Sequence, residues 1–255
     1  MKFNNKEIAS PLARNDVIAR SEATKQSNSV DSGLLNINKP SGISSFGVVK
    51  KVKYILGAKK VGHCGTLDPM AEGVLLVVFG SATKKQDSLM IESKTYRAVI
   101  LLGTKTDTGD ITGKVLENKD VPSFSKIEIT KALEKFIGEI KQLTPSFSAV
   151  KRNGIKMYEL ARKGIFIERP PRIVNIYKID LLDSSQKELS IRVECSSGTY
   201  IRTLAEDIGA ELGVPATLKA LCREKVGNYS LETSINWDKL CSFDKNALLN
   251  CKIDI

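Results

Sequence analysis

The segment formed by residues 61–73 carries the side chains with the clearest capacity for chemistry. Asp68 and His63, the only histidine among 255 residues, lie there between glycines, and the apolar residues 74–79 follow at once. A short apolar run that is bounded by glycines and rich in β-branched residues predicts a buried strand. A loop anchored to such a strand can present catalytic groups rigidly. An ordinary turn with Asp68-Pro69 at its corner accounts for the same residues equally well.

Three further side chains could act together with Asp68. Arg202 follows a glycine turn at the expected start of a helix, where its guanidinium could lower the pKa of a nearby carboxyl group and hold it by paired hydrogen bonds. Tyr96 lies in an expected strand, and its ring could stack on a flipped base. Lys84 lies in an expected short helix. Each residue also has a structural alternative, since turn acids, strand aromatics and ion pairs occur in many folds.

The composition favours a globular protein that binds a polyanion. Hydrophobic residues make up 42% of the chain, which is enough for a core and excludes disorder of the full length. The net charge of +10 points to nucleic acid as the leading partner, although a basic protein without such a partner could carry the same charge. We expect no membrane span, because no apolar run reaches about 18 residues, and no secretory signal.

Cysteine and histidine usage narrows the chemistry. The five cysteines include no Cys-x-x-Cys pair, so we expect neither a disulfide framework nor a zinc site and place the protein in a reducing cytoplasm. A single histidine excludes most metal centres and most Ser-His and Cys-His mechanisms. Without a second histidine or an acidic cluster we predict no metal site, which leaves Asp68 as a candidate nucleophile or base.

Periodicity predicts the elements that must position these side chains. Strands and helices alternate without a regular βαβ pattern, so we expect an α+β fold with a mixed, mostly antiparallel central sheet flanked by helices and loops. The expected strands are residues 33–40, 74–79, 94–103, 173–182, 189–195 and 226–231. The expected helices are residues 44–56, a short one from 81, 125–140 with a capping box at Ser125 and Glu128, 157–163, one that follows the turn at 197–200 and ends by Gly213, and 218–223.

The expected helix at residues 44–56 combines a core face with many lysines. The apolar period that predicts its buried face runs through Phe46, Val49, Val52, Ile55 and Leu56. The lysines that lead from this helix to the segment 61–73 are Lys50, Lys51, Lys53, Lys59 and Lys60. Such a run is often only a solvated helix face, but its position makes an RNA contact an equal alternative.

Several spaced motifs occur in a fixed order. They are Asn38-Lys39-Pro40-x-Gly42-x-Ser44-Ser45, Gly62-His63-Cys64-Gly65-Thr66-Leu67-Asp68-Pro69 with Gly73-Val74-Leu75, Lys94-x-Tyr96-Arg97, Gly103-x-x-Thr106-Asp107-Thr108-x-Asp110, Ser197-Gly198-Thr199-Tyr200-Ile201-Arg202-Thr203 and Leu221-Cys222-Arg223. Together they resemble the motifs of the TruB family of tRNA pseudouridine synthases over roughly residues 33–231. No single motif is specific, but the ordered set is, and it implies the pseudouridine synthase fold.

The resemblance implies roles for individual residues. Asp68 would be the nucleophile, which attacks either C1′ of the ribose or C6 of the uracil, and Arg202 would pair with it. Tyr96 would stack on the uracil and help to remove the C5 proton, Leu221 would line the uracil pocket, and His63 would fill the space left by the flipped uridine. The other residues that match family positions near the substrate are Lys39, Lys84, Asp110 and Tyr200.

The resemblance also implies a substrate and a domain organisation. The target would be uridine 55 in the T loop of tRNA, the isomerisation would need no cofactor, and no protein partner is implied, so we expect a monomer. Residues 1–32 would be a poorly ordered extension, 33–231 the catalytic domain with an RNA-gripping insertion at about 143–172, and 232–255 a short tail too small for the family's PUA-type RNA-binding domain. Cys64 departs from the family pattern, in which a small hydroxyl residue is common at this position.

Two other functions fit parts of the pattern. A non-catalytic RNA-binding or tRNA-folding module would explain the charge of +10 and the short tail, but it would not require Asp68, Tyr96 and Arg202 together. An enzyme that acts on ribosomal RNA within a guide-RNA particle would keep the chemistry and change the substrate. The missing PUA-type domain weighs against this second alternative.

Overall fold

The computed structural model describes residues 32–143, 151–152, 155–156 and 171–255. Residues 32–255 belong to one compact unit. The expectations for residues 1–31, for the helix at 157–163 and for most of the insertion at 143–172 lie outside the described residues. Among the helices that are described, none is both long and apolar enough to cross a bilayer.

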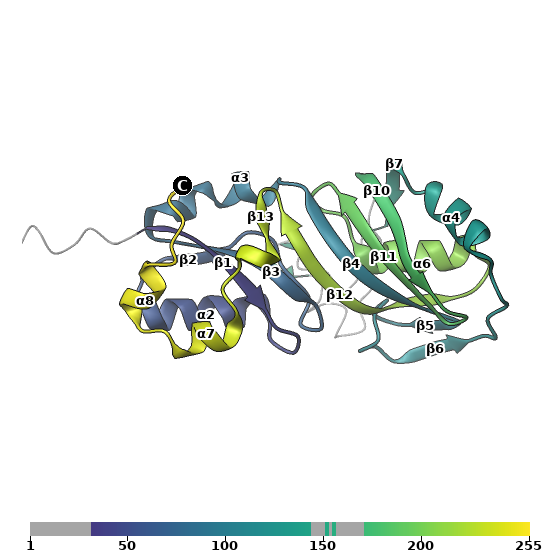
Figure 1. Ribbon diagram of the computed structural model, residues 1–255, viewed down its shortest axis with the longest axis horizontal. Helices are drawn as coiled ribbons and strands as arrows, with labels where there is room; N and C mark the ends of the chain where they lie inside the picture. Colours follow the sequence, from purple (N-terminus) through teal and green to yellow (C-terminus); the bar gives the residue numbers. More distant parts are fainter. Residues whose placement is uncertain (1–31, 144–150, 153–154, 157–170) are drawn as a thin grey trace, which may run out of the picture. The chain divides into compact units, whose positions relative to one another are not determined.

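A mixed sheet forms the centre of the fold (Figure 1). Within the described residues its nine strands are β1 (Gly33–Lys39), β2 (Val61–His63), β3 (Glu72–Phe79), β4 (Lys94–Leu102), β7 (Gly138–Gln142), β10 (Arg172–Ser184), β11 (Glu188–Cys195), β12 (Ala216–Val226) and β13 (Tyr229–Ser230). The order is β1-β3-β12-β4-β11-β10-β7, with β2 paired to β3 and β13 to β12. Only β3 and β12 pair in parallel among these strands. The expected α+β fold with a mostly antiparallel sheet is therefore confirmed.

Two small hairpins and several helices surround this sheet. The hairpins are β5 (Thr104–Thr106) with β6 (Val115–Asn118), and β8 (Lys151–Arg152) with β9 (Ile155–Lys156). The helices are α2 (Ser45–Leu56), α3 (Gln86–Met90), α4 (Lys126–Glu134), α6 (Ile201–Glu211), α7 (Trp237–Ser242) and α8 (Lys245–Leu249), with the 3₁₀ turns η1 (Gly80–Lys85) and η2 (Leu231–Thr233). In Figure 1, α2, α7 and α8 gather at the β1 end of the sheet, and α4 and α6 lie toward the β7 end.

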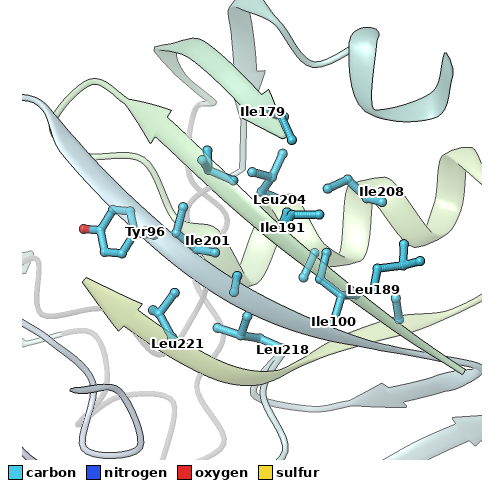
Figure 2. Packing of buried hydrophobic residues seen from close by; sticks show 14 of the residues in the cluster. Tyr96, Ile100, Ile179, Leu189, Ile191, Ile201, Leu204, Ile208, Leu218 and Leu221 are labelled. Carbon is cyan, nitrogen blue, oxygen red and sulfur yellow. The ribbon is translucent and has the colours of Figure 1, made fainter. Parts of the chain in front are cut away.

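Each end of the sheet has its own hydrophobic core. Figure 2 shows side chains of α6 packed on those of β4, β11 and β12, and the burial of each such side chain stabilises the fold by about 2 kcal/mol. At the other end, α2 packs on β1 and β3, and Leu240 and Leu248 complete this second core. Residues 232–255 are therefore more than a tail, because α7 and α8 supply core side chains.

The helix expected at residues 44–56 is confirmed as α2. The Ser44 side chain caps it by accepting a hydrogen bond from the amide of Gly47, and Gly57 ends it at φ +61°. The expected burial of Phe46 is wrong, since this ring is 61% exposed. Val48 is buried instead. Position 48 lies about half a turn around the helix from position 46 and faces the sheet, so the Phe46 ring points to solvent.

One expected helix is shorter in the structure, and another is a strand. The helix expected at 125–140 ends at Glu134, and Gly138, at φ +100°, starts strand β7. The helix expected at 218–223 is wrong, because these residues lie within β12. Register shifts between Leu218 and Ala220 break the alternation of this strand, so its apolar side chains have a helix-like spacing. The last expected strand, 226–231, is shortened to β13, which pairs back onto β12 around Gly227.

Candidate active site

The loop that carries Asp68 is fixed by backbone contacts on several sides. The Ser45 hydroxyl donates to the carbonyl of Leu67 and accepts from its amide, both at 2.9 Å. The amide of Gly42 donates to the carbonyl of Pro69 at 2.8 Å. These contacts join the residues on both sides of Asp68 to the start of α2. The loop is therefore positioned before any substrate arrives.

Glycine is required where this loop enters β3. Gly73 has φ +105°, and a Cβ atom there would lie 2.3 Å from the carbonyl oxygen of Arg223 on the neighbouring strand. The parallel pairing of Gly73 with Arg223 thus depends on the absence of a side chain. This close approach brings β12 and its side chains to the loop of Asp68.

Lys39 lies buried beneath the same loop. Its Nζ atom donates to the carbonyl oxygens of Pro40 at 2.8 Å, Ile43 at 2.6 Å and Pro69 at 3.3 Å. Burial lowers the pKa of Lys39 to about 8, and the nearby Asp68 carboxylate opposes this shift. The structure thus places Lys39 as a support of the loop, with its ammonium turned to the backbone.

Asp68 meets Arg202, the second residue of α6. The two nearest contacts are Arg202 Nε to Asp68 Oδ2 at 3.0 Å and Arg202 Nη2 to Asp68 Oδ1 at 3.4 Å, so the guanidinium faces both carboxylate oxygens. The Arg202 side chain is 7% exposed and that of Asp68 is 34% exposed. Arg202 is therefore fixed, whereas the carboxylate remains open to a ligand on one side.

A second acid holds the other edge of the guanidinium. Arg202 Nη1 donates to the carbonyl of Thr108 at 3.0 Å and lies 3.8 Å from Asp110 Oδ2. Asp110 is buried, and its Oδ1 accepts hydrogen bonds from the hydroxyl of Thr108 and the amide of Thr112, each at 3.0 Å. The turn after β5 therefore anchors Arg202 through Asp110 and holds it toward Asp68.

The pKa of Asp68 shifts opposite to the effect of its arginine. Burial raises the pKa of this carboxyl group and Asp110 adds to the rise, while Arg202 and Lys39 oppose it. The sequence led us to expect a pKa lowered by Arg202, and this lowering is present but smaller than the effect of burial. An ionised Asp68 is thus a poorly solvated and reactive carboxylate.

A cavity of about 470 Å³ opens beside Asp68. Tyr96 of β4 and Leu221 of β12 line it together with Tyr200 and Arg202 at the start of α6. In Figure 2, Tyr96 and Leu221 lie at one end of the apolar cluster, beside Ile201. The cavity is in the size range of small-molecule sites and combines an aromatic ring, an apolar wall and a carboxylate. Such a set can bind a planar ring and present a nucleophile to it.

Tyr200 and Gln142 show how the start of α6 is fixed. The Gln142 side chain is fully buried; its amide nitrogen donates to the Tyr200 carbonyl at 3.2 Å and its oxygen accepts from the Tyr200 amide at 3.0 Å. The Tyr200 ring lies 5.4 Å from the guanidinium of Arg172. The N-terminal turn of α6, which carries Arg202, is therefore held from β7.

The sequence did not single out two buried cations that line the cavity. Arg223 Nε donates to the carbonyl of Val74 at 2.7 Å, and its Nη2 donates to the carbonyl of Gly65 at 3.1 Å. Burial raises the pKa of Tyr96, and the charge and hydrogen bond of Arg223 oppose that rise. Arg223 therefore links the loop of Asp68 to Tyr96. The available signal was an arginine directly after the apolar residues Leu221 and Cys222.

Lys94 is the second such cation. Its Nζ donates to the carbonyl oxygens of Met90 at 2.6 Å and Glu92 at 2.5 Å. Burial lowers the pKa of Lys94 to about 8, and the nearby charge of Arg223 adds to this effect. Lys94 is the first residue of the motif Lys94-x-Tyr96-Arg97, but it received no role from the sequence, because a lysine in a strand is ordinarily exposed.

Four residues expected near the substrate do not line the cavity. Lys39 and Asp110 are the buried supports described above, and the other two are His63 and Lys84. Among the described residues that line the cavity, neither His63 nor Lys84 occurs. Lys84 is exposed on η1. His63 is half-buried on β2, its Nδ1 has no hydrogen-bond partner among the described residues, and burial followed by the charge of Arg223 lowers its pKa. Burial therefore favours the neutral form of the imidazole.

Comparison with known proteins identifies similar chains. Residues 53–201 match the family model described as TruB family pseudouridylate synthase, N-terminal domain. The chain is 47% identical over 218 residues to "tRNA pseudouridine synthase B" of Endomicrobium trichonymphae, covering 86% of this chain and 94% of that protein. It is 48% identical over 208 residues to the protein of the same name from Clostridium tetani, covering 82% and 72%.

Solved structures give the same result at lower identity. A chain in a Cbf5-Nop10-Gar1 complex is 31% identical, with a TM-score of 0.64, and the match covers 82% of this chain and 53% of that one. A chain in an H/ACA RNP bound to a substrate RNA containing 2′-deoxyuridine is also 31% identical, with a TM-score of 0.60 and coverage of 81% and 51%. This chain thus spans about half the length of those solved chains.

Proposed function

Because the chain belongs to the TruB family of pseudouridylate synthases, we propose that it isomerises uridine 55 in the T loop of tRNA to pseudouridine with Asp68 as the nucleophile. The observation that carries the proposal is the Asp68–Arg202 pair, with Nε and Oδ2 3.0 Å apart, at a cavity that also contains Tyr96. The names of the two relatives described above support tRNA as the substrate.

The reaction rearranges bonds within one nucleotide. Asp68 attacks C1′ of the ribose or C6 of the uracil, the bond between N1 and C1′ breaks, and the uracil rotates. A bond then forms between C5 and C1′, and the bond between Asp68 and the substrate carbon breaks, which returns the free carboxylate. The C5 proton leaves while N1 gains a proton. No atom or electron is gained or lost, so the reaction requires no redox or energy cofactor.

Each cavity residue has a defined part in this reaction. Arg202 keeps the carboxylate of Asp68 ionised and oriented, since it faces both oxygens. Tyr96 stacks on the uracil and assists removal of the C5 proton, and Leu221 forms the apolar wall on which the base rotates. Burial makes the carboxylate more reactive because fixed groups replace water around it.

The substrate uridine must leave its stack to reach this cavity. Unstacking costs a few kcal/mol and is cheapest in a loop, which favours a T-loop target. His63 then fills the space that the uridine vacates. Its neutral state agrees with a packing role, because burial lowers the pKa of this imidazole.

Lys84 is exposed and does not line the cavity, which suits a contact with a phosphate of the RNA. The proposal takes the chain to act on tRNA as a monomer in the cytoplasm.

Tritium release tests the proposal. A T-arm transcript labelled at C5 of uridine is incubated with the wild type and with the Asp68→Asn variant, and pseudouridine is mapped in the product. We expect the variant to be slower by more than about 10³-fold, as for loss of a nucleophile. The matched control is Glu72→Gln, an exposed acid at the end of the same loop, which should keep wild-type activity. Wild-type release from the Asp68 variant would show that another group acts.

A second candidate function is supported by the solved structures. The similarity to a chain of an H/ACA RNP bound to a substrate RNA favours an enzyme that works within a ribonucleoprotein, as in the alternative of ribosomal RNA modified with a guide RNA. The isolated chain and an unmodified tRNA transcript separate the two possibilities, since only the first function predicts turnover without a guide RNA. Binding of tRNA with every uridine left unmodified would favour a non-catalytic RNA-binding module.

A further inference from the structure

The outer face of α2 combines exposed aromatic rings with lysines. Phe46 is 61% exposed and Tyr54 is 84% exposed, although rings of this size usually contribute to a core. The Nζ atom of Lys50 lies 5.1 Å from the centre of the Phe46 ring, and Lys53 is exposed beside them. Positions three and four residues apart share one face of a helix. These four residues are the α2 stripe.

No acidic residue of the same segment offsets this charge. Residues 33–67 contain six lysines and no aspartate or glutamate, and the first carboxylate that follows is Asp68. Lys59 and Lys60 are exposed and continue the positive charge beyond the end of α2. Exposed rings among lysines are typical of surfaces that bind nucleic acid.

The α2 stripe begins next to the catalytic loop. Ser45, which precedes Phe46, exchanges two hydrogen bonds of 2.9 Å with the backbone of Leu67, the neighbour of Asp68. From this point the 12 residues of α2 extend about 18 Å. An RNA whose reactive uridine reaches Asp68 therefore has its adjoining stem within reach of the stripe.

We propose that the α2 stripe binds the phosphate backbone of the double-helical stem that adjoins the reactive uridine. This inference rests on the proposed function, since it takes the substrate RNA as the ligand. Lys50 and Lys53 neutralise phosphates, and Phe46 and Tyr54 contact the riboses in the shallow minor groove. Phosphate contacts fix position and add affinity without reading bases. The stripe therefore contributes to binding and not to the chemical step.

A double variant, Lys50→Gln with Lys53→Gln, tests this surface. Both side chains are exposed, so the fold should persist. We expect the dissociation constant for tRNA to rise about tenfold near physiological salt, and the slope of log affinity against log salt to fall by about 1.4 to 1.8, as for two lost phosphate contacts. The single-turnover rate at saturating tRNA should stay within about twofold of the wild type.

The control removes the same charge elsewhere. Lys126 and Lys131 are exposed on α4, which lies toward the other end of the sheet (Figure 1). Their double replacement by glutamine should leave affinity and salt slope close to wild type. If both double variants lose the same tRNA affinity, the loss is explained by the lower net charge alone, and the proposal is overturned. Wild-type affinity in the α2 variant would also overturn it and leave this face to a protein partner or to solvent.

The two proposals can fail separately. If the wild type binds tRNA through the α2 stripe but isomerises no uridine, the proposed function is wrong and the surface stands. If tRNA is isomerised and the α2 variant keeps the wild-type salt slope, the surface alone is wrong. A T-arm hairpin shortened to the loop and its closing pairs should bind the α2 variant and the wild type equally, because the stem that contacts the stripe is missing.

Discussion

Two groups of positive side chains lie near Asp68, and the protein holds them in different ways. Those of the first group are buried, and each donates hydrogen bonds to backbone carbonyl oxygens. Those of the second group, the lysines of the α2 stripe, are exposed to solvent. The first group, named the buried cations, consists of Lys39, Lys94, Arg202 and Arg223.

The difference lies in what each charge can act upon. A buried charge is costly unless fixed polar groups replace its water, so every buried cation commits its donors to the protein. The carbonyl groups that it contacts belong to residues beside the site, such as Gly65, Pro69 and Thr108. An exposed lysine keeps its donors for a ligand and acts through screened interactions. We therefore expect the buried cations to govern turnover and the α2 stripe to govern affinity.

Among the buried cations, replacement of Arg202 by methionine should have the largest effect. It removes the guanidinium that holds both oxygens of Asp68 and leaves the buried Asp110 without its cation. We expect a loss of stability of about 3 kcal/mol and a fall in kcat of at least about 10²-fold, with little change in the KM for tRNA. Urea denaturation and single-turnover kinetics measure the two effects.

The pH profile of the same variant provides a sharper check. Burial raises the pKa of Asp68 and Arg202 opposes the rise, so removal of the arginine should raise this pKa further. In the proposed mechanism Asp68 attacks as an ionised carboxylate, so the acid limb of kcat/KM should move to higher pH. Arg202→Lys, which keeps the charge without the paired geometry, should shift it less. An acid limb unmoved by the methionine variant would contradict a role of Arg202 in the ionisation of Asp68.

Replacement of Arg223 by methionine should have the next largest effect. The carbonyl groups of Gly65 and Val74 lose their buried donor, which costs about 2 kcal/mol. The pKa of Tyr96, already raised by burial, should rise further because Arg223 opposes that shift. We expect kcat to fall about tenfold while tRNA affinity stays within about twofold of wild type, measured by single-turnover kinetics and direct binding. Arg223→Lys is the control that retains the charge.

A loss of tRNA affinity with unchanged kcat in Arg223→Met would contradict the expected division, in which buried cations govern turnover and the lysines of the α2 stripe govern affinity.

The predictable elements are those whose periodicity and end signals all lie within one short stretch of sequence. α2 shows its period, its serine cap and its terminal Gly57 within a short stretch of sequence, and the capping box at Ser125 is likewise present. Strand β12 was not predictable, because its register shifts place Leu221, Cys222 and Arg223 in consecutive buried positions. A strand buried on both sides has no alternation to detect.

The candidate site was predictable only in part. Arg202 meets Asp68 across 134 positions of sequence, and nothing local to either residue indicates the partner. The ordered motifs of the family suggested the pair, whereas composition and periodicity could not. Lys94 and Arg223 were missed as supports because buried cations are rare and their partners are backbone carbonyl groups, which leave no mark in the sequence.

The smallest effect concerns Lys39 and appears only at alkaline pH. Burial lowers the pKa of Lys39 to about 8, from 10.5 as its ordinary value. Between these pH values the unfolded chain binds more protons than the folded chain, so the free energy of unfolding should rise with pH. We expect Lys39 to contribute about 1 kcal/mol to this rise, after allowance for solvent screening. The rise should shrink by that amount in Lys39→Met, as measured by urea denaturation at about pH 8 and 10.5.

The matched control for this last experiment is Lys50→Met in the α2 stripe. It removes an exposed ammonium and should keep the wild-type rise in stability. A rise that survives in Lys39→Met would mean that the ammonium of Lys39 is as well solvated as that of a surface lysine. The three carbonyl contacts of Lys39 would then not confine its charge, and the division between buried cations and exposed lysines would fail at the residue that supports the loop of Asp68.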